Sequence, residues 1–264
     1  RAPPPVTAGD ELPEGCDAVV DPDTVTRTGP ALLVADEATP GMNARLAGQD
    51  LQRDGVLMPA GSRITSEAIL ACRLAGIETA AVRQPALSIQ IEDQCRETWL
   101  RSRLMALGCN LVEHDNPADL MIRTVRQDEP RLALQPGDSS WIEVLSDGVV
   151  HIEMPQRFDG LVAAYLALVV PIVAALSAQR ICAIKRPLAR KIASAIGMTE
   201  LVLLRSGEGK LNPMAIGTIT LAALAQADAY CLVPAGVEGH AIGEMIGAAR
   251  LDDPFGISHA EQPS

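Results

Sequence analysis

Aromatic side chains are scarce in this 264-residue chain, since two each of Phe, Tyr and Trp make up 2% of it. The core must therefore be built from Ala, Leu, Val and Ile, which agrees with an apolar content of 48%. The same scarcity removes the aromatic platforms on which single-stranded nucleic acids stack. Basic residues are also few: 22 Lys and Arg face 33 Asp and Glu, which gives a formal net charge of −11. Nucleic acid is not an expected partner, because phosphate neutralisation needs clustered cations.

Metal-binding and nucleotide-binding signatures are missing as well. The six cysteines, at 16, 72, 95, 109, 182 and 231, form no Cys-x-x-Cys pair and suit neither a zinc site nor a compact disulfide framework. We interpret them as scattered small apolar residues in a reducing, cytoplasmic compartment. The four histidines stand far apart in the sequence. The chain also has no Walker loop, dinucleotide fingerprint, nucleophile elbow or His-Glu-x-x-His motif.

One apolar run challenges the expectation that no membrane is involved. Residues 161–178 read "LVAAYLALVVPIVAALSA", about long enough to span a bilayer. Pro171 interrupts the run, and Asp159 and Arg180 bracket it. We therefore predict a buried helix that is kinked or restarted at Pro171.

The pattern along the chain predicts an α/β multidomain protein with boundaries at 1–85, 86–180 and 181–264. The first region alternates turn residues with short apolar runs and is predicted to be β-rich, with one helix from Thr65 or Ser66 to Gly76 and a strand at 79–83. The central region alternates strands and helices, which indicates a sheet covered by helices. The last region is predicted to be a small β-rich domain.

Several elements are predicted inside the last two regions. Strands are expected at 86–91, 109–115, 118–125 and 131–135, and a helix at 95–108 with Gly108 as its stop. Asp147-Gly148 predicts a two-residue turn between the strands "WIEVLS" and "VVHIEM". In the last region we expect a short helix at 187–197, strands at 200–206, 210–216 and 229–234, and a short helix in "TLAALAQAD".

Two stretches of the central region carry candidate chemistry. Glu92 and Asp93 follow the strand 86–91, and acids beyond the carboxyl end of such a strand can hold a divalent cation or act as a base. Adjacent acids at a strand-to-helix junction are also good helix N-terminal residues, so capping remains an alternative. The loop 135–140, "QPGDSS", offers hydroxyls and backbone N–H groups to a phosphate, although Asp138 opposes an anion. Arg157 precedes the apolar helix and can add positive charge there.

Four stretches together resemble the molybdopterin molybdenumtransferase (MoeA-type) family. These are "GDELPEGCDAVV" (9–20), "GMNARLAGQDLQRDGVLMPAGSRITSEAILACRLAGI" (41–77), "LARKIASAIGMTELVLLR" (188–205) and "LAQADAYCLVPAGVEGHAIGE" (224–244). The resemblance covers most of the chain. It implies a central three-layer α/β molybdopterin-binding domain flanked by β-rich domains, in a homodimer.

The resemblance also implies a chemistry. In this family molybdenum from molybdate enters the dithiolene of adenylylated molybdopterin, and adenylate is cleaved in a reaction that needs a divalent cation such as Mg²⁺. On the matching positions, Asp93 is the candidate catalytic acid, and Asp93 and Glu92 are the candidate metal ligands. The candidate pterin contacts are Pro136, Gly137, Ser139, Ser140, Pro155 and Arg157.

The central region departs from the family pattern at these positions. The family's Ser-Thr-Gly-Asp-Glu is matched by 90–94, which keeps only the Asp, and its Ser-Gly-Gly by 123–125, Arg-Thr-Val. Its Lys-Pro-Gly-Lys-Pro loop is matched by 135–139, which lacks both lysines, and its Leu-Pro-Gly-Asn-Pro turn by 154–158, which keeps one proline. Three hypotheses follow: a molybdenum-inserting enzyme with altered site residues, a non-catalytic scaffold that serves other molybdenum-cofactor proteins, and an unrelated globular protein.

Overall fold

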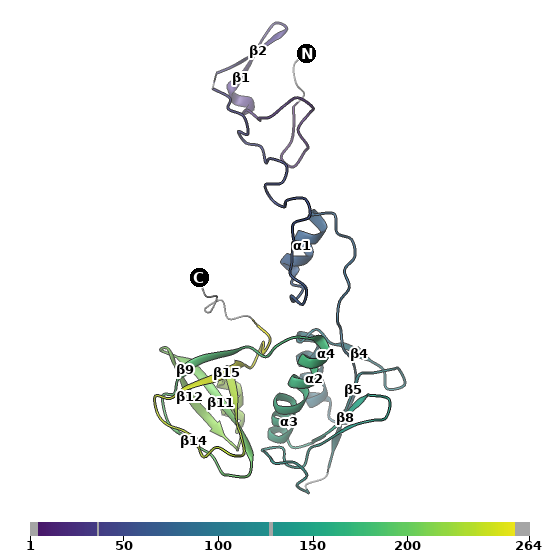
Figure 1. Cartoon of the computed structure of the whole chain (residues 1–264), viewed down its shortest axis with the longest axis vertical. Coiled ribbons are helices and arrows are strands. Elements are labelled where there is room, and N and C mark those ends of the chain that lie inside the picture. Colours follow the sequence, from purple (N-terminus) through teal and green to yellow (C-terminus); the bar gives the residue numbers. More distant parts are fainter. Residues whose placement is uncertain (1–4, 36, 127–128, 257–264) are drawn as a thin grey trace. The chain divides into compact units, whose positions relative to one another are not determined.

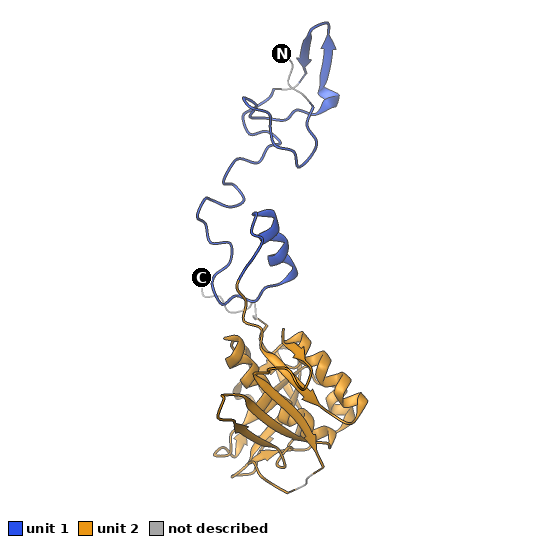
Figure 2. Cartoon of the chain, turned by 90° about the vertical axis from the view of Figure 1, so that its right-hand side faces the viewer, with its two compact units in different colours: residues 1–80 blue, residues 81–264 orange. Residues whose placement is uncertain are grey.

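The computed structural model describes residues 5–35, 37–126 and 129–256. The chain divides into two compact units, Arg1–Ala80 and Ala81–Ser264 (Figure 2). Both contain helices and strands, and the second contains several sheets, so the predicted mixed α/β class is confirmed. The order of the elements is traced by colour in Figure 1.

The first unit has little regular structure. It contains η1 (Pro22–Thr24), the antiparallel pair β1 (Val25–Thr28) and β2 (Ala31–Val34), and α1 (Ser66–Leu74). Thr65 caps α1 by accepting a hydrogen bond from the backbone N–H of Ala68 at 3.2 Å, and Gly76 follows it with φ +76°, as the sequence predicts. The strand predicted at 79–83 does not form. None of the described residues of this unit is buried.

The second unit is built around a five-stranded sheet in the order β4-β3-β5-β8-β7. Its first four strands run parallel, and β7 is antiparallel to β8. The bounds are β3 (Ala86–Gln90), β4 (Asn110–Val112), β5 (Leu120–Val125), β7 (Trp141–Val144) and β8 (Val150–Pro155). The hairpin at Asp147-Gly148 forms, but it closes from Val144 to Val150 and is therefore longer than the predicted two-residue turn.

Helices cover one face of this sheet. They are α2 (Gln94–Ala106), α3 (Phe158–Ala164), the π-helical segment η2 (Tyr165–Val169) and α4 (Val170–Ser177), and Figure 1 shows them on the side of the strands that faces the C-terminal strands. Apolar side chains of alternate strand positions, such as Leu87, Leu120 and Ile152, pack beneath them.

The opposite face carries two rows of mostly polar side chains. One row is Ser88, Met121, His151 and Glu143, and the other is Gln90, Arg123, Glu153 and Trp141. A parallel crossover usually takes a dozen or more residues and contains a helix. Here residues 113–119 alone connect β4 to β5, which is too short for one. The described residues therefore place no helix on this face, where the predicted three-layer arrangement needs one.

The apolar run folds as a nearly continuous helix from Phe158 to Ser177. It is the one helix in the described part of the chain that is long and apolar enough to cross a membrane, but most of it is buried inside the protein. Proline has no N–H and clashes with the preceding turn of an α-helix. The π-helical segment η2 lies directly before Pro171, and α4 begins around that proline, which accommodates both effects.

The C-terminal part of the second unit is a six-stranded sheet in the order β12-β11-β13-β15-β9, with β6 paired to β11. Its elements are β6 (Leu134–Gln135), β9 (Ala183–Pro187), β11 (Thr199–Gly207), β12 (Lys210–Ile216), α5 (Leu221–Gln226), β13 (Ala229–Val233) and β15 (Met245–Arg250). Residues of both sheets, Leu87 and Leu203 among them, belong to one hydrophobic core. A second core lies within the C-terminal strands.

The short helix predicted at 187–197 is wrong. The segment instead contains the end of β9 and β10 (Ile192–Ala193), which pairs with β14 (Gly239–His240). A Cβ on Gly239 would lie 2.0 Å from the carbonyl oxygen of Ile192, so this close pairing requires glycine there. Tertiary pairing with a distant strand has overridden the local helical pattern.

All six cysteines are free. Burial raises the pKa of the Cys109 thiol to about 12 and that of Cys231 to about 12. Because the thiolate is the reactive form, these two are structural apolar residues, as the sequence predicts.

Candidate functional site

Three neighbouring parallel strands end at one edge of the five-stranded sheet. Glu92 follows β3, Arg126 follows β5 and Gln156 follows β8. Glu92 Oε2 accepts from Arg126 Nη2 at 3.0 Å and from Gln156 Nε2 at 3.3 Å, so one carboxylate links the three junctions. In open α/β sheets this edge is where ligands bind. The structure therefore brings one predicted site residue together with two polar residues that sequence reasoning did not select.

Asp93 caps helix α2. Its Oδ1 accepts a hydrogen bond from the backbone N–H of Arg96 at 2.8 Å, and its Oδ2 pairs with Arg96 Nη1 at 2.9 Å. The backbone hydrogen bond from Arg96 lowers the pKa of the Asp93 carboxyl, and the charge of Arg96 acts in the same direction. The capping alternative is thus confirmed. A capped, ionised Asp93 still lies at the edge of the sheet, so its catalytic assignment stays a prediction.

The residues present do not form a Mg²⁺ cage. Glu92 and Asp93 are each directed to an arginine, Arg126 and Arg96. Among the residues that the structure describes, no three His, Cys, Asp or Glu side chains are grouped so as to hold a metal ion. Mg²⁺ is usually held by one or two carboxylates together with substrate phosphates and water, so Glu92 and Asp93 as metal ligands stay a prediction.

The loop proposed as a phosphate cradle is packed into the protein. Pro136, Gly137, Ser139 and Ser140 are all buried, and Gln135 lies on β6, against β11. Gly137 has φ +111°, and a Cβ there would lie 3.3 Å from the carbonyl oxygen of Gly160. The loop thus turns directly against the first turn of α3. Its hydroxyls and backbone face protein atoms rather than an open cleft.

Arg157 occupies the N-cap position of α3 and keeps its side chain largely in solvent. Its Nε donates to Asp159 Oδ1 at 2.7 Å, and the same oxygen accepts from the backbone N–H of Gly160 at 2.8 Å. Pro155 ends β8 just before it and is buried. Arg157 is therefore the predicted ligand contact that solvent reaches most readily, although Asp159 already compensates its charge.

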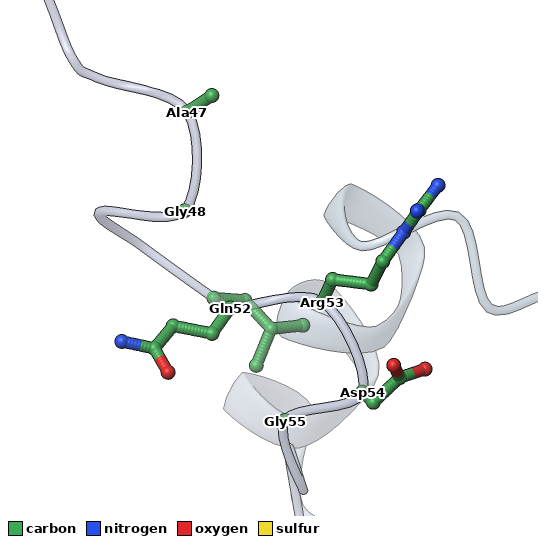
Figure 3. A pocket seen from close by; sticks show the side chains of 7 residues that line it. Ala47, Gly48, Gln52, Arg53, Asp54 and Gly55 are labelled. Carbon is green, nitrogen blue, oxygen red and sulfur yellow. The ribbon is translucent and has the colours of Figure 1, made fainter.

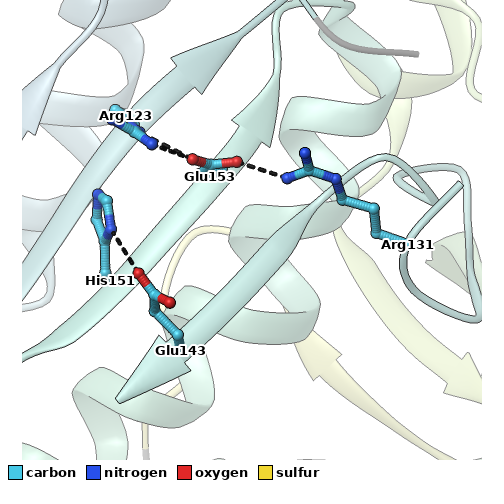
Figure 4. Close-up of polar contacts among 5 residues, drawn as sticks. All are labelled: Arg123, Arg131, Glu143, His151 and Glu153. Atoms are coloured by element: carbon cyan, nitrogen blue, oxygen red, sulfur yellow. Dashed lines mark hydrogen bonds and ion pairs between the residues drawn. The ribbon is translucent and has the colours of Figure 1, made fainter. Parts of the chain in front are cut away.

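A buried carboxylate flanked by two arginines was not selected from the sequence. Glu153 on β8 is 8% exposed and receives hydrogen bonds from Arg123 on β5 and from Arg131 Nη1, the latter at 2.7 Å (Figure 4). The guanidinium of Arg131 also lies 5.8 Å from the ring centroid of Trp141. The hydrogen bond from Arg123 is the main cause that lowers the pKa of the Glu153 carboxyl, and Arg131 adds to it. This cluster fixes the segment before the loop 135–140 to the sheet.

The first unit contains a wide hollow that is not enclosed. Residues 47–48 and 51–55 line about 650 Å³ (Figure 3). All of these residues come from one exposed loop. Small-molecule sites bury most of their ligand between walls from several elements. We therefore place the candidate site at the edge of the five-stranded sheet instead.

Comparison with known proteins places the chain beside molybdopterin biosynthesis proteins. Residues 4–76 match the family model described as the MoeA N-terminal region (domain I and II). None of the curated proteins matches the sequence. Among solved structures, a molybdopterin biosynthesis MoeA protein from Pyrococcus horikoshii OT3 is 18% identical with a TM-score of 0.61, over 92% of this chain and 74% of that one. A molybdenum cofactor biosynthesis protein from Pyrococcus furiosus is 19% identical with a TM-score of 0.60, over 76% of this chain and 81% of that one.

At such identities the structural matches establish the shared fold, and the family match is confined to the N-terminal region. Together they confirm the resemblance found in the sequence: residues 4–76 match the MoeA N-terminal region, and the chain shares the fold of solved molybdopterin biosynthesis proteins.

Proposed function

We propose that this chain acts in molybdenum cofactor biosynthesis, where it binds molybdopterin or its adenylate and takes part in inserting molybdenum from molybdate. The observation that carries the proposal is the polar edge of the five-stranded sheet, where Glu92, Arg126 and Gln156 meet. Its support is the MoeA-type resemblance together with the usual location of ligands in such sheets.

The charges at this edge suit an anionic ligand. Arg126 and Arg157 lie beyond the ends of β5 and β8, and both reach solvent. Arg126 pairs with the exposed Glu92, and such surface pairs contribute little, so a phosphorylated ligand can compete for its guanidinium group. Arg157 pairs with the less exposed Asp159 through Nε, which leaves its other N–H groups for the ligand. These two arginines supply the positive charge that two lysines supply in the family loop. In this chain the matching positions are Gln135 and Asp138. Pro155 and the buried loop residues Pro136, Gly137, Ser139 and Ser140 then shape the wall behind the ligand.

A titration of the full chain with molybdopterin tests this proposal. We expect micromolar binding, and we expect Arg157→Gln to weaken it about tenfold or more, since a charge-assisted hydrogen bond is lost. Arg101→Gln is the matched control, because Arg101 also makes one surface ion pair, with Glu97 on α2 at 2.8 Å. The control should bind like the unsubstituted chain. Absence of binding, or equal weakening in both variants, would contradict the proposal.

Asp93→Asn separates catalysis from binding, because asparagine keeps the cap of α2 but removes the charge. If Asp93 is a catalytic acid, this variant retains the ligand and loses molybdenum insertion, measured as metal content of the pterin. If the unsubstituted chain binds the ligand without any insertion, it is the non-catalytic scaffold instead.

We further propose that the chain is a homodimer. The first unit exposes large apolar side chains on α1 and elsewhere, among them Leu33 (65%), Leu70 (60%) and Leu74 (81%). Unpaired apolar surface of this kind is typical of protein interfaces. Multi-angle light scattering at micromolar concentration is expected to give twice the chain mass of 27.9 kDa. Leu74→Glu should shift the mass toward the monomer, whereas a monomeric unsubstituted chain would refute the dimer.

A further inference from the structure

The open face of the five-stranded sheet contains a hollow that the proposed function does not use. It measures about 160 Å³ and lies on the face opposite the helices, over β3, β5 and β8. His114, from the short connection between β4 and β5, closes one side of it. Parallel sheets are normally covered on both faces. Here the missing layer leaves a polar depression where an ordinary α/β domain has a packed helix.

The polar side chains that line this hollow can donate hydrogen bonds, and none of the lining side chains is a carboxylate. The polar members are Ser88, Gln90, His114, Arg123 and His151, and Met121 and Ile122 complete the lining. Figure 4 shows the side chains of Arg123 and His151 on the same face of neighbouring strands. A guanidinium, two imidazoles, a hydroxyl and an amide form a donor set that matches an oxyanion.

Ser88 indicates independently that a partner belongs here. The residue is 2% exposed, and its hydroxyl has no hydrogen-bond partner among the residues that the structure describes. A buried polar group without a partner is destabilising and calls for an explanation. Because Ser88 lines the hollow, a ligand oxygen bound there can satisfy its hydroxyl.

The neighbouring carboxylates position the cations. Glu153 accepts from Nε and Nη2 of Arg123 and also binds Arg131, so this triad keeps a net positive charge. Two of the five N–H bonds of Arg123 are thereby used, and the guanidinium is fixed beside the hollow. Glu143 lies 3.4 Å from His151 Nδ1 and orients that ring from the exposed side. The negative charge of Glu143 opposes an anion, but its side chain is solvent-screened at 46% exposure.

We propose that this hollow binds a tetrahedral oxyanion, of the class of phosphate, sulfate and molybdate, with Ser88, His114, Arg123 and His151 as its donors. The volume suits a small ion with water and is well below the roughly 300 Å³ at which pockets for drug-sized ligands begin, so it excludes a pterin. The site is separate from the edge formed by Glu92, Arg126 and Gln156, and it does not depend on the proposed function.

Calorimetric titration of the full chain with inorganic phosphate tests the site, followed by the same titration with sulfate and with molybdate. We expect one saturable site with a millimolar or lower Kd. Ser88→Ala and His114→Ala should each weaken binding about tenfold. Neither should lower the melting temperature, since one removes an unpartnered hydroxyl and the other changes an exposed loop residue. His240→Ala, in the C-terminal strands, is the matched histidine control and should bind like the unsubstituted chain.

The outcomes of these titrations identify which anions bind the hollow, and they separate this proposal from the proposed function. Binding of all three ions identifies a general oxyanion site, and binding of molybdate alone identifies a molybdate site. No saturation by any of the three at roughly 10 mM, far above a millimolar Kd, would overturn the proposal, as would unchanged affinity in Ser88→Ala and His114→Ala. The molybdopterin titration addresses the edge formed by Glu92, Arg126 and Gln156, so its failure does not decide this test.

Discussion

Glu153→Gln is expected to lower the free energy of unfolding by about 2 kcal/mol and the melting temperature by roughly 4–8 °C. Glu153 is almost fully buried and is the common partner of Arg123 and Arg131. Removing its charge leaves two guanidinium groups near each other without their counterion. Breaking a fully buried pair costs about 3–5 kcal/mol, but both arginines reach solvent, which reduces the effect. Thermal unfolding followed by circular dichroism measures the change.

At acidic pH the difference in stability between the unsubstituted chain and Glu153→Gln should disappear. The pKa of the Glu153 carboxyl is lowered in the folded protein from its ordinary value of 4.5, first by the hydrogen bond from Arg123. A lowered folded pKa gives stability that is present above the unfolded pKa and is lost as pH falls through the folded one. The unsubstituted chain and Glu153→Gln should therefore differ most above about pH 4.5 and converge below it.

Glu143→Gln is the matched control, because Glu143 lies on the adjacent strand β7 with its side chain 46% exposed. We expect a change below about 0.5 kcal/mol at any pH, as for most exposed charges. Equal losses in the two variants would mean that the buried cluster adds no specific stability.

The elements that the sequence predicted correctly are those fixed by local signals. Helix α2 has its cap at Asp93 and its stop at Gly108, and α1 has its cap at Thr65. Capping residues and a 3.6-residue period lie within one stretch of chain, so reading them requires no knowledge of the partner elements. In contrast, the strand β10 pairs Ile192 with His240, far along the sequence, and its local pattern indicated a helix.

The candidate site likewise has features that local sequence signals predict and features that depend on tertiary contacts. Its position after β3 was predictable, because Glu92 and Asp93 directly follow an apolar run. Its partners were not, since Arg126 and Gln156 reach Glu92 only through the strand order β3-β5-β8. Neither was the burial of the loop 135–140, which depends on contact with Gly160 in α3. The open face is also a tertiary property, although the alternation of His151 and Glu153 with apolar residues in "VHIEMP" is a signal that could have indicated it.

Tyr165→Ala is expected to have the largest effect on stability, about 3–5 kcal/mol. Tyr165 begins the π-helical segment, is fully buried and belongs to the core that both sheets share. Its ring meets Trp99 of α2 edge to face, with centroids 5.2 Å apart, and the Arg103 guanidinium lies 5.6 Å from its centroid. Differential scanning calorimetry should show a fall in melting temperature of roughly 6–20 °C.

The size of this effect follows from the scarcity of aromatics. Apart from Phe158 at its start, the helix 158–177 otherwise contributes small and aliphatic side chains to the core, such as Ala163, Ala164 and Val169, so the helix itself offers little bulk to fill the volume that Tyr165 leaves. Tyr165→Phe keeps the ring against Trp99 and should change stability by less than about 1.5 kcal/mol, because the buried hydroxyl that it removes has no hydrogen-bond partner among the described residues. Equal losses in Phe and Ala variants would place the stabilisation in the hydroxyl. A loss below about 1.5 kcal/mol in the Ala variant would mean that the helix layer collapses around the cavity, which close-packed cores rarely achieve.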